Sequence, residues 1–354
     1  MMTKDNCLSI PPILIEVTRG PLVESWHRGW VAVVDSAGSA IATLGDVSTR
    51  TFFRSAAKPF QAIPLVTSGA ADRYGLTPAE LAVITGSHSG EEIHLATVAS
   101  ILARGPLSDD ELQCGAHPPF DSRAAKALRM AGQAPGALHN NCSGKHAGML
   151  LLASHGGHPR ASYLDPAHPI QVEIREVVAE FTGTPVGQIV VAVDGCSAPV
   201  FGVSLWAMAL SYARLVDPAG STPRQQAARR ILAAMIEFPE MVGGTRRRLD
   251  TDLMRALPGR IVSKVGAEGV QLIGIPPTAT YPRGRGVAIK IEDGDIRRAR
   301  DPVVIEVLRQ LGVLDEEALS KLQDYRQATL RNHRDLVVGE VRPAFNLFGS
   351  TPQN

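Results

Sequence analysis

Apolar and polar residues alternate near both ends of the chain, and this pattern predicts strands there. "PILIEVTRG" is apolar and β-branched, and "GWVAVVDSAGSAIATLGD" has two apolar runs around the turn residues 35–38, which predicts a hairpin. Towards the other end, apolar residues alternate over 287–291 before Asp293-Gly294, a dipeptide typical of a second hairpin. A helix beginning near Pro302 is expected to follow.

The middle of the chain is mostly helical in pattern. An amphipathic helix is expected from about Glu91, and "SGKHAGMLLLASHGG" is typical of a helix that ends at glycines. Three further amphipathic helices are predicted from "PIQVEIREVVAEFTG", "VSLWAMALSYARLVD" and "RQQAARRILAAMIEFPEMV". One segment differs, because "QIVVAVDGCSAPVFG" indicates a buried strand that runs into a tight turn.

Strands from both ends that enclose a helical middle predict an α+β fold. The arrangement expected is an antiparallel sheet built from both termini, with a helical domain inserted between them. Residues 1–55 and 260–354 would hold the sheet, and residues 56–259 would form the largely helical part of one catalytic unit. The length of 354 residues allows about two domains, or one domain with a large insertion.

Composition narrows the class of protein further. With 44% hydrophobic residues, 20% charged residues and a formal charge of +1, the chain can form a packed core and lacks the clustered positive face that nucleic acid requires. The one basic run, Arg246 to Arg248, is interpreted as a solvated helix end. The N-terminus is a poor secretory signal, and no apolar stretch is long enough for a membrane span. Four cysteines are too few for a disulfide framework, so we expect a cytoplasmic protein with reduced thiols.

The first candidate for chemistry is the Ser-x-x-Lys motif formed by Ser55 and Lys58 in "RTFFRSAAKPFQAI". If a helix starts at Ser55, the two side chains lie one turn apart on the same face. A serine hydroxyl needs a base to act as a nucleophile, and a lysine amine in apolar surroundings can be neutral enough to serve. Helix capping by the serine is the alternative, and the motif alone does not exclude it.

Two later segments support a catalytic interpretation. "GRIVSKVGAEGV" places Lys264 on a predicted strand next to glycines, which resembles the third motif of serine β-lactamases and penicillin-binding proteins. "ITGSHSGEE" places Ser87 at a turn before a helix, where the middle motif of that group falls. Taken separately, Ser87 is also a plausible N-cap and Lys264 a plausible solvated strand residue. Three motifs in the same order favour a shared site.

Cysteines suggest a second centre. Cys142 and Lys145 open a helix in "ALHNNCSGKHAGML", while Asp194 and Cys196 follow a strand in "VAVDGCSAPV". Two thiolates suit zinc, and two buried structural cysteines are the alternative. A third ligand would come from His139, His146, Asp194 or Lys145. Ligand chemistry favours a histidine, because a lysine must first lose a proton.

Together these residues resemble those of the rhizobial-type, thermolabile L-asparaginases. The segments that carry the resemblance are "FFRSAAKPFQA", "TGSHSGEEIH", "HNNCSGKHAGML", "VDGCSAPV" and "RIVSKVGAEGV", and the similarity extends from about Ile15 to "VGEVRPAF". The resemblance implies a serine-β-lactamase-like fold, a homodimer, and hydrolysis of L-asparagine to L-aspartate and ammonia.

The resemblance also implies roles for single residues. The family's two Ser-Lys pairs fall on Ser55 with Lys58 and on Ser87 with Lys264. Its accessory zinc ligands fall on Cys142, Lys145 and Cys196, so the resemblance selects the lysine as third ligand. Asp194 takes the place of an acid beside the metal.

The mechanism expected from these residues is nucleophilic catalysis through an acyl-enzyme. Ser55 would attack the side-chain amide, Lys58 would take its proton, and Ser87 and Lys264 would relay protons. Arg54 is a candidate for binding the substrate carboxylate and Asp194 for binding the α-ammonium. The alternatives are a glutaminase or peptidase-like hydrolase of the same fold, or a zinc-dependent dimer module without catalysis, which would leave the Ser-Lys motifs unexplained.

Overall fold

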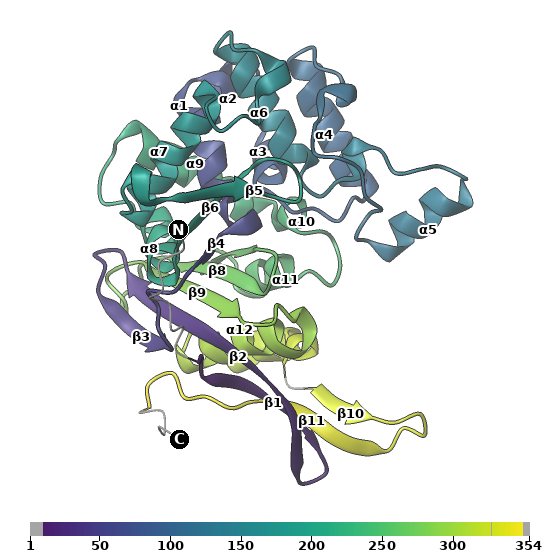
Figure 1. Cartoon of the computed structure of the whole chain (residues 1–354), viewed down its shortest axis with the longest axis vertical. Helices are drawn as coiled ribbons and strands as arrows, with labels where there is room; N and C mark the ends of the chain where they lie inside the picture. The colour runs from purple at the N-terminus through teal and green to yellow at the C-terminus, as the bar shows by residue number, and fades with distance from the viewer. Residues whose placement is uncertain (1–9, 327, 350–354) are drawn as a thin grey trace, which may run out of the picture.

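The computed structural model describes residues 10–326 and 328–349. Cys7 and the rest of the N-terminal segment before residue 10 lie outside these residues. Within them, strands from the two ends of the chain form one sheet, and most of the helices come from the segment between those ends (Figure 1).

The main sheet has eight strands in the order β10-β11-β1-β2-β9-β8-β7, with β3 pairing β2 off this path. Each of these pairings is antiparallel. The strands are β1 (Ile13–Arg19), β2 (Leu22–Asp35), β3 (Ala40–Leu44), β7 (Val262–Val265), β8 (Val270–Ile275), β9 (Arg285–Ile291), β10 (Ala328–Arg331) and β11 (Val337–Pro343). The predicted α+β fold, with a sheet built from both chain ends and helices inserted between them, is confirmed.

Thirteen α-helices lie within the described residues. They are α1 (Lys58–Thr67), α2 (Ala70–Arg73), α3 (Pro78–Thr85), α4 (Glu92–Arg104), α5 (Ser122–Met130), α6 (Ser143–His155), α7 (Pro169–Thr182), α8 (Leu205–Val216), α9 (Pro223–Glu237), α10 (Pro239–Val242), α11 (Leu249–Ala256), α12 (Asp301–Gln310) and α13 (Glu316–Lys321). The expected helices from Glu91 and near Pro302 correspond to α4 and α12, and the other four predicted segments contain α6, α7, α8 and α9.

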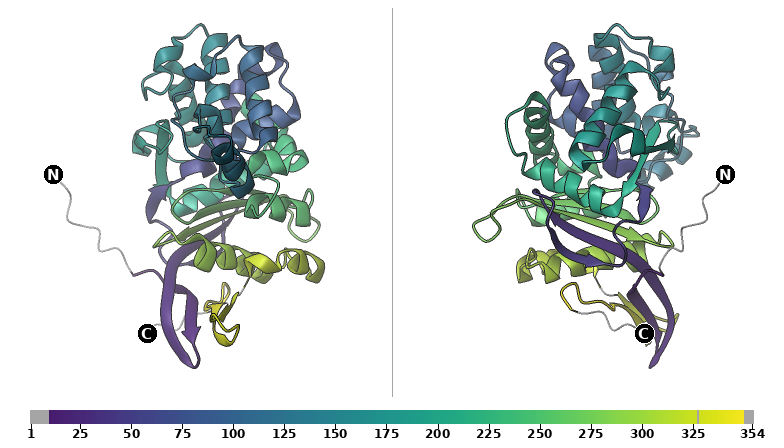
Figure 2. Two further views of the ribbon diagram at one scale, coloured as in Figure 1. Left: turned by 90° about the vertical axis from the view of Figure 1, so that its right-hand side faces the viewer. Right: turned by 60° about the vertical axis from the view of Figure 1, so that its left-hand side comes forward.

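Alternation along the strands divides the molecule into two hydrophobic cores. On β2, Ala32 and Val34 face the core shared with the inserted helices, whereas Val31 and Val33 face a second core that α12 and α13 complete. The sheet therefore lies between two helical layers, as the edge-on view of Figure 2 shows. Helix α8 packs so closely on strand β9 that a Cβ added at Gly286 would lie 1.8 Å from the Ala209 carbonyl oxygen.

Local residues explain where the first hairpin turns. Asp35 Oδ1 accepts hydrogen bonds from the backbone N–H groups of Ala37 and Ser39, at 3.0 and 2.8 Å. Gly38 takes a φ of +91°, a conformation that glycine adopts without a Cβ clash. The predicted hairpin between β2 and β3 is confirmed.

Two predictions about strands are wrong. Asp293-Gly294 does not connect a hairpin, because after β9 the chain turns into a π-helix at Ile296–Arg300 and then into α12. The strand predicted to be buried is β5 (Val190–Val193), the edge of a three-stranded sheet in the order β4-β6-β5, with β4 at Arg50–Phe52 and β6 at Pro199–Ser204. Val190 is 43% and Val193 74% exposed, so this edge strand is not buried.

The chain leaves β4 for the helices at a short 3-10 turn, Arg54–Ala57, directly before α1. This irregular start is where the Ser-x-x-Lys motif lies. The other candidate residues lie in the turn after α3, at the start of α6, in the turn between β5 and β6, and on β7. The proposed division into residues 1–55, 56–259 and 260–354 stays a prediction.

Candidate active site

Ser87 is hydrogen-bonded to two buried lysines. Lys264 Nζ lies 2.8 Å and Lys58 Nζ 3.1 Å from Ser87 Oγ. The three residues come from three separate elements: Ser87 from the turn after α3, Lys58 from the first residue of α1, and Lys264 from β7. All three are almost fully buried, with exposures of 3%, 1% and 0%. The predicted contact between Ser87 and Lys264 is therefore present.

The turn that carries Ser87 is fixed by the helix before it. Thr77 and Glu80 form a capping box at the start of α3, which stabilises a short helix that leads directly to Gly86. A Cβ at Gly86 would lie 2.4 Å from the Met241 carbonyl oxygen, so only glycine fits against α10 there. The Ser87 N–H in turn donates to the Val242 carbonyl oxygen at 2.8 Å.

Lys58 hydrogen-bonds Ser87 rather than Ser55. Its Nζ donates to the carbonyl oxygens of Gly86 at 2.5 Å and Asn141 at 3.4 Å, in addition to Ser87. Ser55 lies half-buried in the 3-10 turn, and among the described residues its hydroxyl has no hydrogen-bond partner. The Gly86 and Asn141 carbonyls therefore hold the Lys58 amine away from Ser55. The spacing of Ser55 and Lys58 in the sequence does not reveal this.

Both lysines have lowered pKa values. Burial lowers the pKa of Lys264 well below its usual range; the Asp250 carboxylate opposes this shift, and the nearby Lys58 adds to it. Burial also lowers the pKa of Lys58, with the Cys142 thiol opposing the shift and Lys145 adding to it. Two amines at one hydroxyl repel each other when both are charged, so a neutral amine is favoured at this centre.

The two cysteines and the lysine singled out in the sequence also meet in space. Cys142 precedes α6, Lys145 lies in its first turn, and Cys196 lies in the turn between β5 and β6. Lys145 Nζ is 2.9 Å from Cys196 Sγ, Cys142 Sγ donates to Asn141 Oδ1 at 3.6 Å, and the two sulfurs lie close enough to shift each other's pKa. All three residues are buried.

Electrostatics at this cluster favour a thiolate at Cys142. A hydrogen bond from Cys196 lowers the pKa of the Cys142 thiol; burial opposes the shift, and the Lys58 and Lys145 charges add to it. Burial would lower the pKa of Lys145, but the Cys196 and Cys142 sulfurs outweigh burial and raise it. Once the second thiol and the Lys145 ammonium lose their protons, two sulfurs and an amine form a donor set that suits a four-coordinate zinc ion with one further position.

The other ligand candidates lie elsewhere or have other partners. His146 Nδ1 is hydrogen-bonded to Tyr163 Oη at 2.6 Å, and His139 Nδ1 accepts from the Gly136 N–H at 3.0 Å. Within residues 10–326 and 328–349, no group of three His, Cys, Asp or Glu side chains is arranged to hold a metal ion. The preference for a histidine ligand, which ligand chemistry suggested, therefore finds no support in the geometry.

Arg54 and Asp194 form an ion pair. Arg54 Nε donates to Asp194 Oδ1 at 2.8 Å, and Arg54 Nη1 lies 3.8 Å from Glu268 Oε1. Arg54 adopts a φ of +52°, a strained conformation for a non-glycine residue, at the point where the chain enters the 3-10 turn. Burial would raise the pKa of Asp194, but Lys145, the Gly195 N–H and Arg54 together lower it, so the carboxylate is charged.

A model of the L-asparaginase II family matches residues 15–343. The chain belongs to the L-asparaginase II family. It is therefore an amidohydrolase that acts on a small-molecule amide. No curated protein matches the chain in a sequence search.

Several solved structures, two of which are named as glutaminases, are similar to this family member. A probable glutaminase from Bacillus subtilis, complexed with 6-diazo-5-oxo-L-norleucine, is 14% identical, with 80% of this chain and 84% of that chain covered and a TM-score of 0.40. A protein named Mglu is 16% identical, with coverage of 82% and 69% and a TM-score of 0.43. A Bacillus glutaminase in 4.3 M NaCl is 13% identical, with coverage of 80% and 91% and a TM-score of 0.39.

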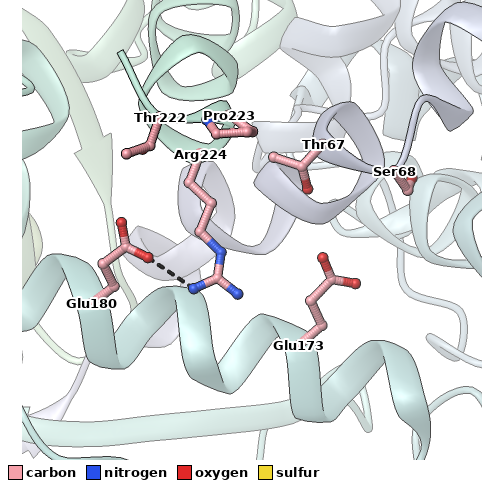
Figure 3. Close-up of a pocket in the computed structure, with 7 residues that line it drawn as sticks. All are labelled: Thr67, Ser68, Glu173, Glu180, Thr222, Pro223 and Arg224. Carbon is pink, nitrogen blue, oxygen red and sulfur yellow. Dashed lines mark hydrogen bonds and ion pairs between the residues drawn. The ribbon is translucent and has the colours of Figure 1, made fainter. Parts of the chain in front are cut away.

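A surface pocket of about 380 Å³ lies away from these residues, at the far end of α1 from Lys58 (Figure 3). It is lined by Thr67, Ser68, Glu173, Glu180, Thr222, Pro223 and Arg224. Arg224 in this pocket already pairs with Glu180 at 2.8 Å and with Glu176 at 3.2 Å. None of the residues singled out in the sequence lines it.

The asparaginase-family site contains residues that sequence reasoning missed. Arg248, interpreted as part of a solvated helix end, instead points inward and contacts Ser87 and Ser89. That interpretation is wrong at Arg248 only, because Arg247 is exposed and Arg246 pairs with Asp121 at 2.6 Å while its side chain stays 36% exposed. Asp250, fully buried beside Lys264, belongs to none of the sequence motifs. The sequence offered one indication of a role for Arg248 and Asp250. Both residues lie at the start of a helix, and the strand that carries Lys264 follows that helix.

A membrane-crossing helix is not found among the described residues, since none combines the length and the apolar character that a span requires.

Proposed function

We propose that this amidohydrolase is an L-asparaginase that uses Ser-Lys nucleophilic catalysis. The observation that carries the proposal is the Ser87 hydroxyl held between two buried lysines at 2.8 and 3.1 Å. A hydroxyl with two amines of lowered pKa is suited to move protons. The second candidate serine, Ser55, is half-buried and has a hydroxyl without a hydrogen-bond partner among the described residues, so it is free to meet a substrate.

In the proposed mechanism, Ser55 Oγ attacks the side-chain amide carbon of asparagine. The hydroxyl proton passes to the Lys58 amine, and the hydrogen-bonded chain from Lys58 through Ser87 to Lys264 delivers a proton to the leaving nitrogen. The C–N bond breaks, ammonia leaves, and a β-aspartyl ester on Ser55 remains. Water then attacks this ester, aspartate leaves, and the proton returns to Ser55. Each lysine ends the cycle in the protonation state in which it began.

Arg54 and Asp194 are proposed to bind the two charged groups of the amino acid. They already form a 2.8 Å ion pair, which presents one cation and one anion side by side. A zwitterionic α-amino acid carries the complementary pair of charges, so exchange of partners can bind the substrate without leaving either side chain uncompensated.

Cys142, Lys145 and Cys196 are proposed to hold an accessory zinc ion. The support is their mutual contact and burial, together with the thiolate character of Cys142. When bound, zinc would order polar groups of the substrate near the serines. Lys145 must lose its proton to act as a ligand, so binding of zinc would release protons.

Three further features belong to the same proposal. Zinc binding requires reduced thiols, and Cys114, Cys142 and Cys196 are free, which supports a cytoplasmic enzyme. The near-neutral charge of +1 supports a small-molecule partner rather than nucleic acid. A homodimer is proposed from the family resemblance, and sedimentation of the purified protein tests it.

The substrate is tested by measuring ammonia release from L-asparagine and L-glutamine at equal concentrations. We expect kcat/KM for asparagine to exceed that for glutamine by about 10-fold or more, because one methylene in a fitted pocket is worth about 1–3 kcal/mol. A preference for glutamine would replace asparaginase by glutaminase, and activity on neither amide would contradict the proposal.

A further inference from the structure

The tripeptide Arg248-Leu249-Asp250 binds both segments that form the Ser87–Lys264 hydrogen bond. Arg248 binds the turn that carries Ser87, and Asp250 binds the strand that carries Lys264. The tripeptide lies at the start of α11 (Leu249–Ala256), which packs against β7 at the boundary between the sheet and the inserted helices (Figure 1). Arg248 extends towards the Ser87 turn and Asp250 towards β7, so two residues separated by one position reach the two elements that carry Ser87 and Lys264.

Arg248 binds the Ser87 turn through both arms of its guanidinium. Its Nη2 donates to the Ser87 carbonyl oxygen at 2.7 Å, and its Nη1 donates to Ser89 Oγ at 2.9 Å. The guanidinium carbon also lies 5.8 Å from the centre of the Phe120 ring. A planar fork with two acceptors fixes the orientation of the peptide between them, which a single-point donor such as lysine does not.

Asp250 binds the strand on both sides of Lys264. Its Oδ2 accepts from the Val265 N–H at 2.9 Å, and its Oδ1 accepts from Ser263 Oγ at 2.9 Å and from Gln271 Nε2 at 2.7 Å. Strand β7 ends the sheet order, so a neighbouring strand lies on one side of it only. The Asp250 carboxylate satisfies the outward N–H of Val265 and holds this edge in place.

We propose that Arg248 and Asp250 are positioning residues that clamp the Ser87 hydroxyl against the Lys264 amine, an inference that rests on the Ser-Lys function proposed above. Neither side chain hydrogen-bonds the Ser87 hydroxyl itself. They fix the backbone on either side of a 2.8 Å contact. A misplacement of about 1 Å at such a contact is enough to lower turnover about 100-fold.

The clamp also sets the charge around Lys264. The groups that influence this amine are Asp250 from α11, Arg248 directly before α11, Lys58 from α1 and Cys142 before α6. Asp250 favours the ammonium form and Arg248 the neutral amine. Loss of the carboxylate should therefore lower the pKa of Lys264, and loss of the guanidinium should raise it.

The test compares Arg248→Met, Arg248→Lys and Asp250→Asn with the exposed control Arg247→Met. For each purified variant, kcat, KM and the pH dependence of kcat for asparagine are measured, with a thermal melt as a check on folding. Arg248→Lys keeps the charge and loses the fork. Asp250→Asn keeps the size, loses the charge, and brings an amide N–H against a backbone or side-chain N–H donor.

We expect kcat to fall about 10- to 100-fold in all three clamp variants, with KM changed less than about threefold. The rise of kcat with pH should move to lower pH in Asp250→Asn and to higher pH in Arg248→Met, each by about one unit. It should stay in place in Arg248→Lys and in Arg247→Met. A purely structural role would not shift the two profiles in opposite directions.

If folded Arg248→Lys and Asp250→Asn keep normal kcat and an unshifted pH profile, the clamp is overturned, while activity of the unaltered enzyme leaves the proposed function standing. If the unaltered enzyme hydrolyses neither asparagine nor glutamine, the proposed function itself fails, and the clamp fails with it. Should Arg248→Met not fold, the Arg248→Lys and Asp250→Asn measurements decide the question.

Discussion

Lys264 Nζ donates to Ser87 Oγ across 2.8 Å, although the two residues are 177 positions apart in the chain. Such a contact forms only when strand β7, which carries Lys264, packs against the inserted helices, which carry Ser87. Lys58 joins the same hydroxyl from a third element, at 3.1 Å. Single substitutions in this arrangement, and in the cysteine cluster beside it, have distinct expected effects on kcat and KM.

Replacing Lys264 by Met should lower kcat for asparagine by about 10³ or more, because the proton relay loses one of its two amines. Methionine has a similar length and suits a buried site, so the fold should be retained. Lys126→Met, on the exposed helix α5, serves as the matched control and should retain full activity. Steady-state ammonia release with near-normal kcat in Lys264→Met would remove this lysine from the mechanism.

Activity should rise with pH through the lowered pKa of Lys264. Burial moves this pKa well below its usual value of 10.5, and the base acts in its neutral form, so the active fraction increases as the proton is lost. The unfolded chain binds more protons than the folded one between these two values. The free energy of unfolding should therefore also rise with pH across that window. A pH–rate profile that falls steadily above about pH 6 is incompatible with a lysine base.

Loss of zinc should weaken substrate binding more than turnover. Cys142→Ser and Cys196→Ser should lose the metal and raise KM about 10-fold or more, with a smaller fall in kcat. Lys145→Ala should behave similarly. Cys114→Ser is the matched control, since Cys114 is equally buried but its Sγ contacts the Ala137 carbonyl oxygen at 3.6 Å.

Elemental analysis of the same proteins separates the possible roles of the metal. Metal content far below one zinc per chain in the unaltered protein, and the same in each variant, would reduce the cysteines to core residues. Complete loss of kcat with an unchanged KM in the zinc-free variants would make zinc the hydrolytic centre instead.

Asp194→Asn should raise KM for asparagine by about 10-fold, because Arg54 loses its partner and the substrate ammonium loses its carboxylate. Asp72→Asn tests the same chemical change in the exposed Asp72–Arg230 pair, where the carboxylate is 69% exposed, and should leave KM unchanged. An unchanged KM in Asp194→Asn would leave the Arg54–Asp194 pair as a structural ion pair.

Local patterns predicted several strands of the sheet and six of the thirteen helices in the described residues, because such elements depend on residues close in sequence. The alternating run at Val31 to Val34 and the turn at Asp35 are of this kind. The wrong hairpin at Asp293-Gly294 shows the limit, since a turn dipeptide does not specify whether a strand or a helix comes after the turn. The contacts of Arg248 depend on how α11 packs against the Ser87 turn, and a run of three arginines contains no trace of that packing.

The candidate site also has features that the sequence predicted and features that it did not. Motif order favoured a shared site for Ser87 and Lys264, and the family resemblance paired these two residues and selected Lys145 over the histidines. Neither indicated that Lys58 would contact Ser87 in place of Ser55, because the Gly86 and Asn141 carbonyls that attract its amine come from distant segments.

The most direct test of the central claim compares asparagine hydrolysis by Ser55→Ala with that by the unaltered enzyme, alongside thermal melts of both. The account predicts that kcat falls by at least about 10³ in Ser55→Ala, with an unchanged melting temperature, and nearly as far in Lys58→Ala. Near-normal turnover by a folded Ser55→Ala protein would contradict nucleophilic attack by this serine and the Ser-Lys mechanism proposed for it.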